Sequence, residues 1–302
     1  MSQPARTPDA LLRRLEWTVV RRLDGLLQGD FRTLFRGNGI DLAGLREYQE
    51  GDDVRHIDWN VTARLQTLHV REYQQDRELT AWFLLDLSPS MDFASDAVSK
   101  RRVLAEFVAV MARLFTGRGN YCGAVLFSSG VDRVVPARNG RRQVLHLLDL
   151  LAPRSRVRRS DATDLRTVLN SAAAMIRRRS MVFVVSDFVS RTDWSPALDR
   201  LARRHDVVAV RLVDPLETRM PDMGLLPFQD AETGEQIIVD TGDARFRRRF
   251  ADMAGQDESS MRAGFARAGI DCLELSTDDD LLDAILRFTL MRRGRFTRSV
   301  AS

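Results

Sequence analysis

The sequence predicts an α/β protein with a doubly wound, mostly parallel sheet and helices on both faces of that sheet. Five short runs rich in Val, Leu, Ile and Phe show little polar–apolar alternation, which is typical of strands that are covered on both faces. Segments with helical spacing of apolar residues lie between these runs. Strands that alternate with helices through right-handed crossovers build an open sheet. The chain has 302 residues, of which 44% are hydrophobic, so it is long enough to form one large domain or one domain with an appended segment.

The N-terminal part differs from this alternation. Residues 9–28 place leucines at helical spacing and predict an amphipathic helix, and an irregular, glycine-containing stretch follows. The run LHVREYQ, residues 68–74, alternates apolar and polar side chains as a strand does. We expect residues 1–77 to form a helical and irregular extension packed on the sheet. Residues 78–295 would then form the α/β domain, and residues 296–302 a disordered tail.

Within the domain, the expected strands are 79–85, 121–127, 181–186, 207–213 and 270–275. The expected helices lie near 98–117, 140–151, 164–178, 194–204, 244–268 and 279–291. The run 131–137, after the turn SSG, predicts an antiparallel edge strand, and LLPFQDAETGEQIIVD at 225–240 predicts a β-hairpin.

Composition and charge argue against several classes of protein. The net charge of +4 raises the question of nucleic-acid binding. However, the 46 basic residues are spread along the chain and balanced by 42 acidic ones, so no specific nucleic-acid binding is expected. No apolar run reaches the roughly 20 residues that span a bilayer, and the N-terminus lacks a secretory leader. We therefore expect a cytoplasmic protein without membrane insertion, with Cys122 and Cys272 as buried thiols.

Carboxylates and hydroxyls follow the predicted strands, at the edge where doubly wound sheets bind their ligands. Asp86, Ser88 and Ser90 come after the first strand, and Asp187 comes after the strand 181–186. Thr163 lies at the start of the helix near 164. Oxygen atoms of this kind suit a hard cation, Mg²⁺ or Mn²⁺, and the absence of His and Cys at these positions argues against zinc.

The same residue types also occur in turns and helix caps, because Asp and Ser side chains bond nearby backbone N–H groups. For DLSPS alone, residues 86–90, that interpretation would be preferred. Three loops that supply oxygens to one edge favour the metal site instead. We expect Asp161 and Asp164, which flank Thr163, to cap the helix near 164 or to bond the metal ligands from outside.

The pattern D-x-S-x-S with a later Thr and Asp resembles the metal-ion-dependent adhesion site of von Willebrand factor type A domains. This resemblance implies that Ser88, Ser90 and Thr163 bind the ion directly, while Asp86 and Asp187 act in or near its coordination sphere, largely through water. It also implies an open coordination position for an acidic group from a partner protein. Mostly neutral direct ligands leave the cation electron-poor, so that it attracts an external carboxylate.

The segment LREYQEGDDVRHIDWNVTARLQTLHVREYQQDRE, residues 45–78, resembles the signature of the bacterial family called domain of unknown function 58 (DUF-58). Together, the two resemblances cover about residues 30–290. Members of this family commonly occur with MoxR-type AAA+ ATPases. The resemblance therefore implies an adaptor or chaperone-linked protein that binds such an ATPase or its client.

The part GDDVRHIDW, residues 51–59, admits a structural and a catalytic interpretation. In the structural one, which we favour, Ile57 and Trp59 anchor the segment on the sheet while arginines pair with aspartates. The pairing residues are Arg46, Arg55 and Arg64 with Asp52, Asp53 and Asp58. In the catalytic one, these aspartates or His56 lie over the ion and hydrolyse a phosphate or peptide bond. A haloacid-dehalogenase-like phosphatase needs a second carboxylate where Ser88 stands, and the chain has neither G-x-x-x-x-G-K-[ST] nor G-x-S-x-G.

Overall fold

The computed structural model describes residues 7–26, 45–49, 54, 57, 59–71, 79–95, 98–152, 163–190, 192–229 and 236–300. The chain divides into two compact units. One unit contains Met1–Phe35 together with Leu79–Ser302, and the other contains Arg36–Glu78.

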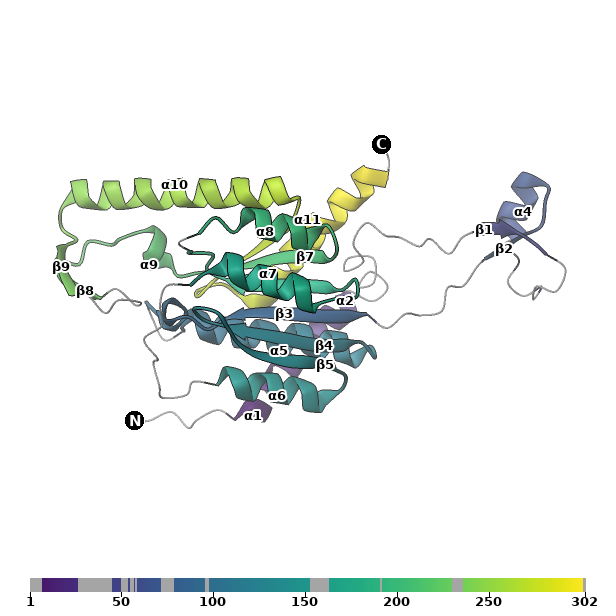
Figure 1. The fold of residues 1–302 in the computed structure, drawn as a ribbon, viewed down its shortest axis with the longest axis horizontal. Helices are drawn as coiled ribbons and strands as arrows, with labels where there is room; N and C mark the ends of the chain where they lie inside the picture. The colour runs from purple at the N-terminus through teal and green to yellow at the C-terminus, as the bar shows by residue number, and fades with distance from the viewer. Residues whose placement is uncertain are drawn as a thin grey trace. The chain divides into compact units, whose positions relative to one another are not determined.

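The larger unit is built on a six-stranded sheet with the strand order β10-β7-β6-β3-β4-β5 (Figure 1). Its strands are β3 (Thr80–Asp86), β4 (Tyr121–Phe127), β5 (Val131–Arg138), β6 (Met181–Ser186), β7 (Asp206–Val213) and β10 (Asp271–Ser276). All neighbours pair in parallel except β4 and β5, which are antiparallel. The predicted α/β class, its five parallel strands and its antiparallel edge strand are therefore confirmed.

Helices cover both faces of this sheet. One face packs against α5 (Lys100–Gly117), α6 (Arg141–Leu151), α11 (Leu281–Val300) and the N-terminal segment; that segment consists of α1 (Pro8–Leu15), the π-helical turn η1 (Glu16–Val20) and α2 (Arg21–Leu26). The other face packs against α7 (Leu165–Met175), α8 (Ser195–Ala202) and α10 (Ala244–Ala268). Cover on both faces explains why the sequence of β6, MVFVVS, is buried at every position.

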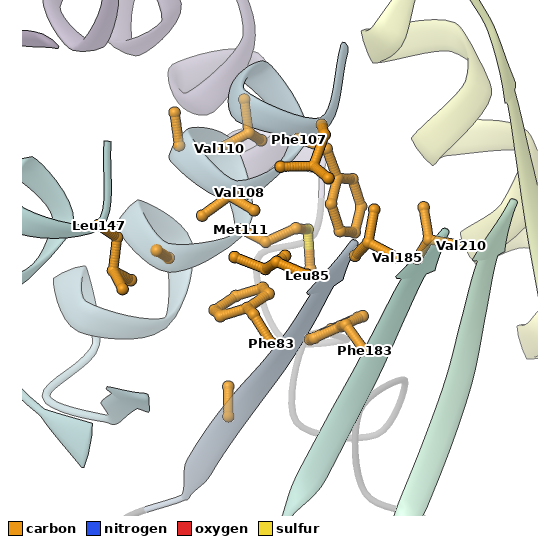
Figure 2. Close-up of a cluster of buried hydrophobic side chains, with 14 of the residues drawn as sticks. Phe83, Leu85, Phe107, Val108, Val110, Met111, Leu147, Phe183, Val185 and Val210 are labelled. Carbon is orange, nitrogen blue, oxygen red and sulfur yellow. The ribbon is translucent and has the colours of Figure 1, made fainter. Parts of the chain in front are cut away.

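Figure 2 shows the centre of the core on the face covered by α5, α6 and α11, where side chains of α5 lie over β3 and β6. Phe83 and Phe183 are paired in register on these two strands, and their rings stack at 5.3 Å. Phe107 of α5 meets Phe183 edge-on at 5.8 Å. Each such ring, once buried, contributes about 2–3 kcal/mol through removal of apolar area from water. This packing fixes β3 and β6 side by side, and with them the loops that follow both strands.

The two strands also mark the place where the connections diverge. The chain leaves β3 into α5 on one face, whereas β6 is preceded by α7 and followed by α8 on the other face. In open α/β sheets, a crevice for ligands opens beyond the carboxyl ends of strands at such a point.

A hairpin extends the chain between β7 and α10. After the short helix α9 (Pro215–Thr218), the strands β8 (Leu225–Gln229) and β9 (Gln236–Asp240) pair antiparallel, as predicted. In Figure 1 this hairpin and the start of α10 lie on the side of the sheet where β3 ends.

Three details differ from the predictions. The expected extension 1–77 does not form a single unit: Met1–Phe35 belongs to the sheet unit, where Leu12 and Leu23 are fully buried in the core, and Arg36–Glu78 forms the other unit. Helix α11 continues to Val300, through most of the tail expected to be disordered. Cys122 is buried as expected, but Cys272 is only half-buried, and both are free thiols.

The smaller unit contains β1 (Leu45–Glu47) and β2 (His69–Arg71), which pair antiparallel, and α4 (Trp59–Leu65). The backbone N–H of His69 donates to Thr62 Oγ1 at 3.1 Å and ties β2 to α4. Trp59 is 66% exposed at the start of α4, so it does not form a core within this unit. The predicted partners Asp52, Asp53, Arg55 and Asp58, with His56, lie outside the described residues, as does the side chain of Arg46. Their pairing with one another and with Arg64 stays a prediction.

Among the helices in the described part of the chain, none has the length and apolar character required to cross a bilayer.

Candidate metal centre

Asp86 is the last residue of β3 and is fully buried. Its Oδ1 accepts the backbone N–H of Ser88 at 2.9 Å, and its Oδ2 accepts the hydroxyl of Ser186 at 2.6 Å. Burial and then the nearby charge of Asp187 raise the pKa of Asp86 from 3.8 to about 6, against the lowering effect of these hydrogen bonds. The carboxylate is therefore held in one orientation, at a place where its negative charge is incompletely balanced.

The two serines lie on a single turn after β3. Pro89 starts the 3₁₀ turn η3 (Pro89–Asp92), for which its fixed φ is suited. The turn brings Ser88 Oγ to 3.0 Å from Ser90 Oγ, and the Ser90 hydroxyl donates to Asp187 Oδ2 at 2.8 Å. Ser88 is buried and Ser90 is half-buried, so the Ser90 hydroxyl is the more accessible of the two.

Asp187 follows β6 in a tightly held loop. Its Oδ1 accepts the backbone N–H of Val189 at 3.1 Å. Phe188 has a φ of 61°, a left-handed conformation that is unusual for an aromatic residue. Contacts with the rings of Trp194 and Phe265, at 5.3 and 4.9 Å between centroids, hold it there. Packing thus imposes a strained backbone that sets the direction of the Asp187 side chain, as is common at functional sites.

Thr163 and Asp164 have different surroundings. Thr163 is buried, and its carbonyl accepts the hydroxyl of Ser190 at 3.1 Å, which ties it to the loop after Asp187. Asp164 caps α7 through the N–H of Thr167 at 3.3 Å and accepts the Thr192 hydroxyl at 2.7 Å. Hydrogen bonds from Thr167 and Thr192 lower the pKa of Asp164. Asp164 is thus a helix cap, one of its two expected roles, and Asp161 lies outside the described residues.

Lys100 was not expected in this cluster. It is fully buried, and its Nζ lies 3.0 Å from Asp187 Oδ2 and 2.6 Å from Glu217 Oε1. Burial alone would lower the pKa of Lys100, but attraction to the two carboxylates outweighs it and raises the pKa. One feature of the sequence could have drawn attention to this residue: Lys100 is the only lysine among 46 basic residues. It also opens α5 directly after the cap Ser99, where a cation opposes the helix dipole.

Glu217 belongs to a second polar cluster, around Asp214 at the end of β7. Asp214 is fully buried and accepts four hydrogen bonds, from Ser95 N, Ser95 Oγ, Leu216 N and Thr277 Oγ1, at 2.9–3.1 Å. Glu217 in turn accepts the N–H of Asp214 at 3.1 Å, which completes a capping box at α9. Lys100 therefore connects the loop of Asp187 with the first turn of α9.

The donor chemistry fits a hard divalent cation. No group of three or more His, Cys, Asp or Glu side chains among the described residues is arranged to hold a metal, so a cation at this edge would depend on hydroxyl oxygens as well. Two carboxylates, Asp187 and Glu217, share one ammonium, and the charge of Asp187 contributes to the raised pKa of the buried Asp86 beside them. Hydroxyls and carboxylates with excess negative charge are ligands that suit Mg²⁺ or Mn²⁺.

The chain is similar to a family of unknown function and to proteins described as uncharacterized. The family model described as "Protein of unknown function DUF58" matches residues 44–260. The uncharacterized protein Rv1480 of Mycobacterium tuberculosis is 36% identical over 285 residues, which cover 94% of this chain and 89% of that protein.

Two solved structures match parts of the chain at low identity. An aerotolerance-related membrane protein from Bacteroides fragilis has a TM-score of 0.46 and 13% identity, and the match covers 72% of this chain and 99% of that one. A von Willebrand factor type A structure from Catenulispora acidiphila has a TM-score of 0.32 and 13% identity, with 45% of this chain and 33% of that one covered.

Proposed function

The chain belongs to the family described as protein of unknown function DUF58, and from this premise we propose that it is a metal-dependent protein-interaction module. It holds Mg²⁺ or Mn²⁺ with the oxygens of Asp86, Ser88, Ser90, Thr163 and Asp187. An acidic side chain of a partner protein fills the open position of the ion. The partner is a MoxR-type AAA+ ATPase or a client of that ATPase.

One observation carries this proposal: hydrogen bonds link Asp86, Ser88, Ser90 and Asp187 in a row at the carboxyl edge of β3 and β6, first through the N–H of Ser88 and then through the side-chain oxygens of the last three residues. The residues come from two loops that the crossover connections bring together at the place where doubly wound sheets bind ligands. Thr163 adjoins the same loops through Ser190.

The surrounding residues hold these oxygens in place rather than offering a reactive group. Ser186 and the N–H of Ser88 fix Asp86, while Ser90 and the N–H of Val189 fix Asp187. None of the described side chains that hydrogen-bond to this row is an imidazole or a thiol. When bound, the ion would supply positive charge and one exchangeable coordination position. The site is then suited to capture a carboxylate, and Asp86 and Asp187 keep their orientation while a ligand exchanges.

The alternative function, a metal-assisted hydrolase, depends on Asp52, Asp53, Asp58 or His56 lying over the ion. These residues are outside the described part of the chain, and no contact among the described residues favours this function.

Isothermal titration calorimetry with Mg²⁺ and with Mn²⁺ tests the metal site. We expect the wild type to bind one ion and Asp86→Ala to lose binding, since Asp86 is the buried acid of the row. Asp164→Ala is the matched control, because Asp164 lies beside Thr163 but acts as a cap of α7. Equal affinity of the wild type and Asp86→Ala would show that these residues do not hold the ion. Circular dichroism checks that each variant is folded.

A co-precipitation with a purified MoxR-type ATPase from the same host tests the partner. Binding should occur with Mg²⁺ and decrease at least about tenfold with chelator or with Asp187→Ala, because an open metal position would be lost. Binding that is unaffected by both changes would show that the ATPase is not recognised through this site.

A further inference from the structure

The proposed function leaves the role of Lys100 open. A buried ammonium is costly to desolvate, and replacement of a buried ion pair by apolar groups of similar size is often neutral or stabilising. Lys100 is moreover the first residue of α5, where the helix dipole disfavours a positive charge. Stability of the fold therefore does not by itself require a cation at this position.

The contacts of the ammonium are specific. Its Nζ bonds Asp187 Oδ2, the same oxygen that accepts the Ser90 hydroxyl, and its second partner, Glu217, is not among the expected metal ligands. The positive charge thus lies one hydrogen bond away from the row of oxygens that would hold the ion. At such short range in a protein interior, a unit charge changes the affinity for another ion by about tenfold or more.

The charges around the site can be counted. The carboxylates of Asp86, Asp187 and Glu217, with the buried Asp214 beside Glu217, outnumber the single ammonium of Lys100. A bound divalent cation would reduce this negative excess. Without the ammonium, the loaded cluster would be more negative by one unit and would repel an incoming carboxylate more strongly.

We infer that Lys100 weakens the binding of the divalent cation and strengthens the binding of an acidic ligand to the loaded site. This inference rests on the proposed function, which it deepens: the ion and the partner's carboxylate bind as a pair, each favouring the other. Lys100 changes both affinities through its charge next to Asp187, without contacting the ligand itself.

Two substitutions change the charge of the cluster in opposite directions. Lys100→Met removes the positive charge and keeps an unbranched side chain of comparable length. Glu217→Gln removes a negative charge and keeps an oxygen that can accept the N–H of Asp214 in the capping box. The Glu217 side chain is 35% exposed, so this variant should fold even where Lys100→Met is less stable.

Electron paramagnetic resonance of free Mn²⁺ measures ion affinity, and water-proton relaxation of the bound Mn²⁺ during an acetate titration measures carboxylate affinity. We expect Lys100→Met to bind Mn²⁺ at least about tenfold more tightly and acetate about tenfold more weakly than the wild type. Glu217→Gln should shift both affinities in the opposite directions. A merely structural defect would weaken both, so the opposed signs distinguish a charge effect from a loss of folding.

The outcomes separate the inference from the proposed function. If the wild type binds Mn²⁺ and neither variant shows opposed shifts, the inference is wrong and the metal site stands. If only Lys100→Met binds Mn²⁺, the inference is supported and the wild type is not a metal-dependent module. If no variant binds Mn²⁺, both are overturned.

Discussion

The hydroxyl of Ser90 donates to Asp187 Oδ2 at 2.8 Å, although 97 positions separate the two residues in the chain. The bond joins the loop after β3 to the loop after β6, and the ammonium of Lys100 donates to the same oxygen at 3.0 Å. Asp187 is therefore oriented by both loops and by α5 at once. A change in any of these elements should alter the orientation of the Asp187 side chain, so the surrounding residues can be tested one at a time.

Asp86→Asn should make the metal-free protein more stable while abolishing metal binding. The raised pKa of Asp86, about 6 against 3.8, means that its charged form is disfavoured in the folded state. Removal of that charge at pH 7.5 should raise the free energy of unfolding by about 1–3 kcal/mol. Asparagine keeps one oxygen, which can accept the N–H of Ser88 or the hydroxyl of Ser186 but not both, so the lost hydrogen bond offsets part of the gain. Urea denaturation in chelator measures the first effect, and calorimetry with Mn²⁺ measures the second.

Asp187→Asn is the matched control for that prediction. It also removes one buried carboxylate charge, but it deprives the buried Lys100 of an ionic partner. A weakened partner for a buried ammonium should destabilise the protein. The two substitutions should thus differ in sign, and destabilisation by Asp86→Asn in chelator would contradict the account given for its pKa.

The pH dependence of stability should reveal Asp86 directly. A carboxyl whose pKa is raised on folding stabilises the folded state while it is protonated, below its unfolded pKa. That contribution is lost as the pH rises through the folded pKa of about 6. In chelator, the wild type and Asp86→Asn should therefore have similar stability near pH 4 and diverge between about pH 4 and 6, with the wild type becoming the less stable. Urea denaturation at several pH values measures the difference, and a constant difference would contradict the prediction.

Asp214→Ala should destabilise the protein strongly although Asp214 is not an expected metal ligand. The substitution leaves the donors of Ser95, Leu216 and Thr277 without their acceptor. Each of these four hydrogen bonds contributes about 0.5–1.5 kcal/mol, so a loss of about 2–4 kcal/mol is expected from urea denaturation. Thr277→Val, which removes a single hydrogen bond, should cost about 1 kcal/mol.

The control for Asp214 is Asp243→Ala, which removes the exposed cap of α10, where the side chain accepts the N–H of Arg245 at 2.7 Å. Loss of an exposed cap typically costs about 1 kcal/mol. Should Asp214→Ala cost no more than Asp243→Ala, the hydrogen bonds around Asp214 would not be the cause of its effect.

The sequence could predict the strands of the sheet and the oxygens that follow them. The runs that became β3 and β6 are apolar at almost every position, and such runs are recognisable without knowledge of their neighbours. Because parallel strands end at one edge, the positions of Asp86 and Asp187 after two of them were enough to place both acids there.

The pairing of Lys100 could not be predicted in this way. A cation at the start of a helix usually lies in solvent, and its contacts with Asp187 and Glu217 span 87 and 117 positions. They depend on how α5 crosses the sheet and where α9 begins, which no local pattern specifies. The same holds for α1, whose leucine spacing indicates an apolar face but not that this face packs with α5 and α6.

Gly123→Ala should destabilise the sheet through a steric effect in the middle of β4. A Cβ at position 123 would lie 2.9 Å from the ring of Trp82 on β3 and 3.0 Å from the backbone nitrogen of Ala137 on β5. The backbone of β5 is held by its pairing with β4, so the strands must move apart or the Trp82 ring must turn. Overpacking of this kind costs about 1–3 kcal/mol, which urea denaturation would measure.

Gly255→Ala provides the opposite case in the same chain. Gly255 lies in the interior of α10, where an added Cβ would have no heavy atom within 4 Å. Alanine favours a helix over glycine by about 1 kcal/mol, so this variant should be more stable than the wild type. If Gly123→Ala were as stable as the wild type while Gly255→Ala gained stability, the Trp82 ring would have to be free to turn. The close approach of β3, β4 and β5 at Gly123 would then not constrain the residue at that position.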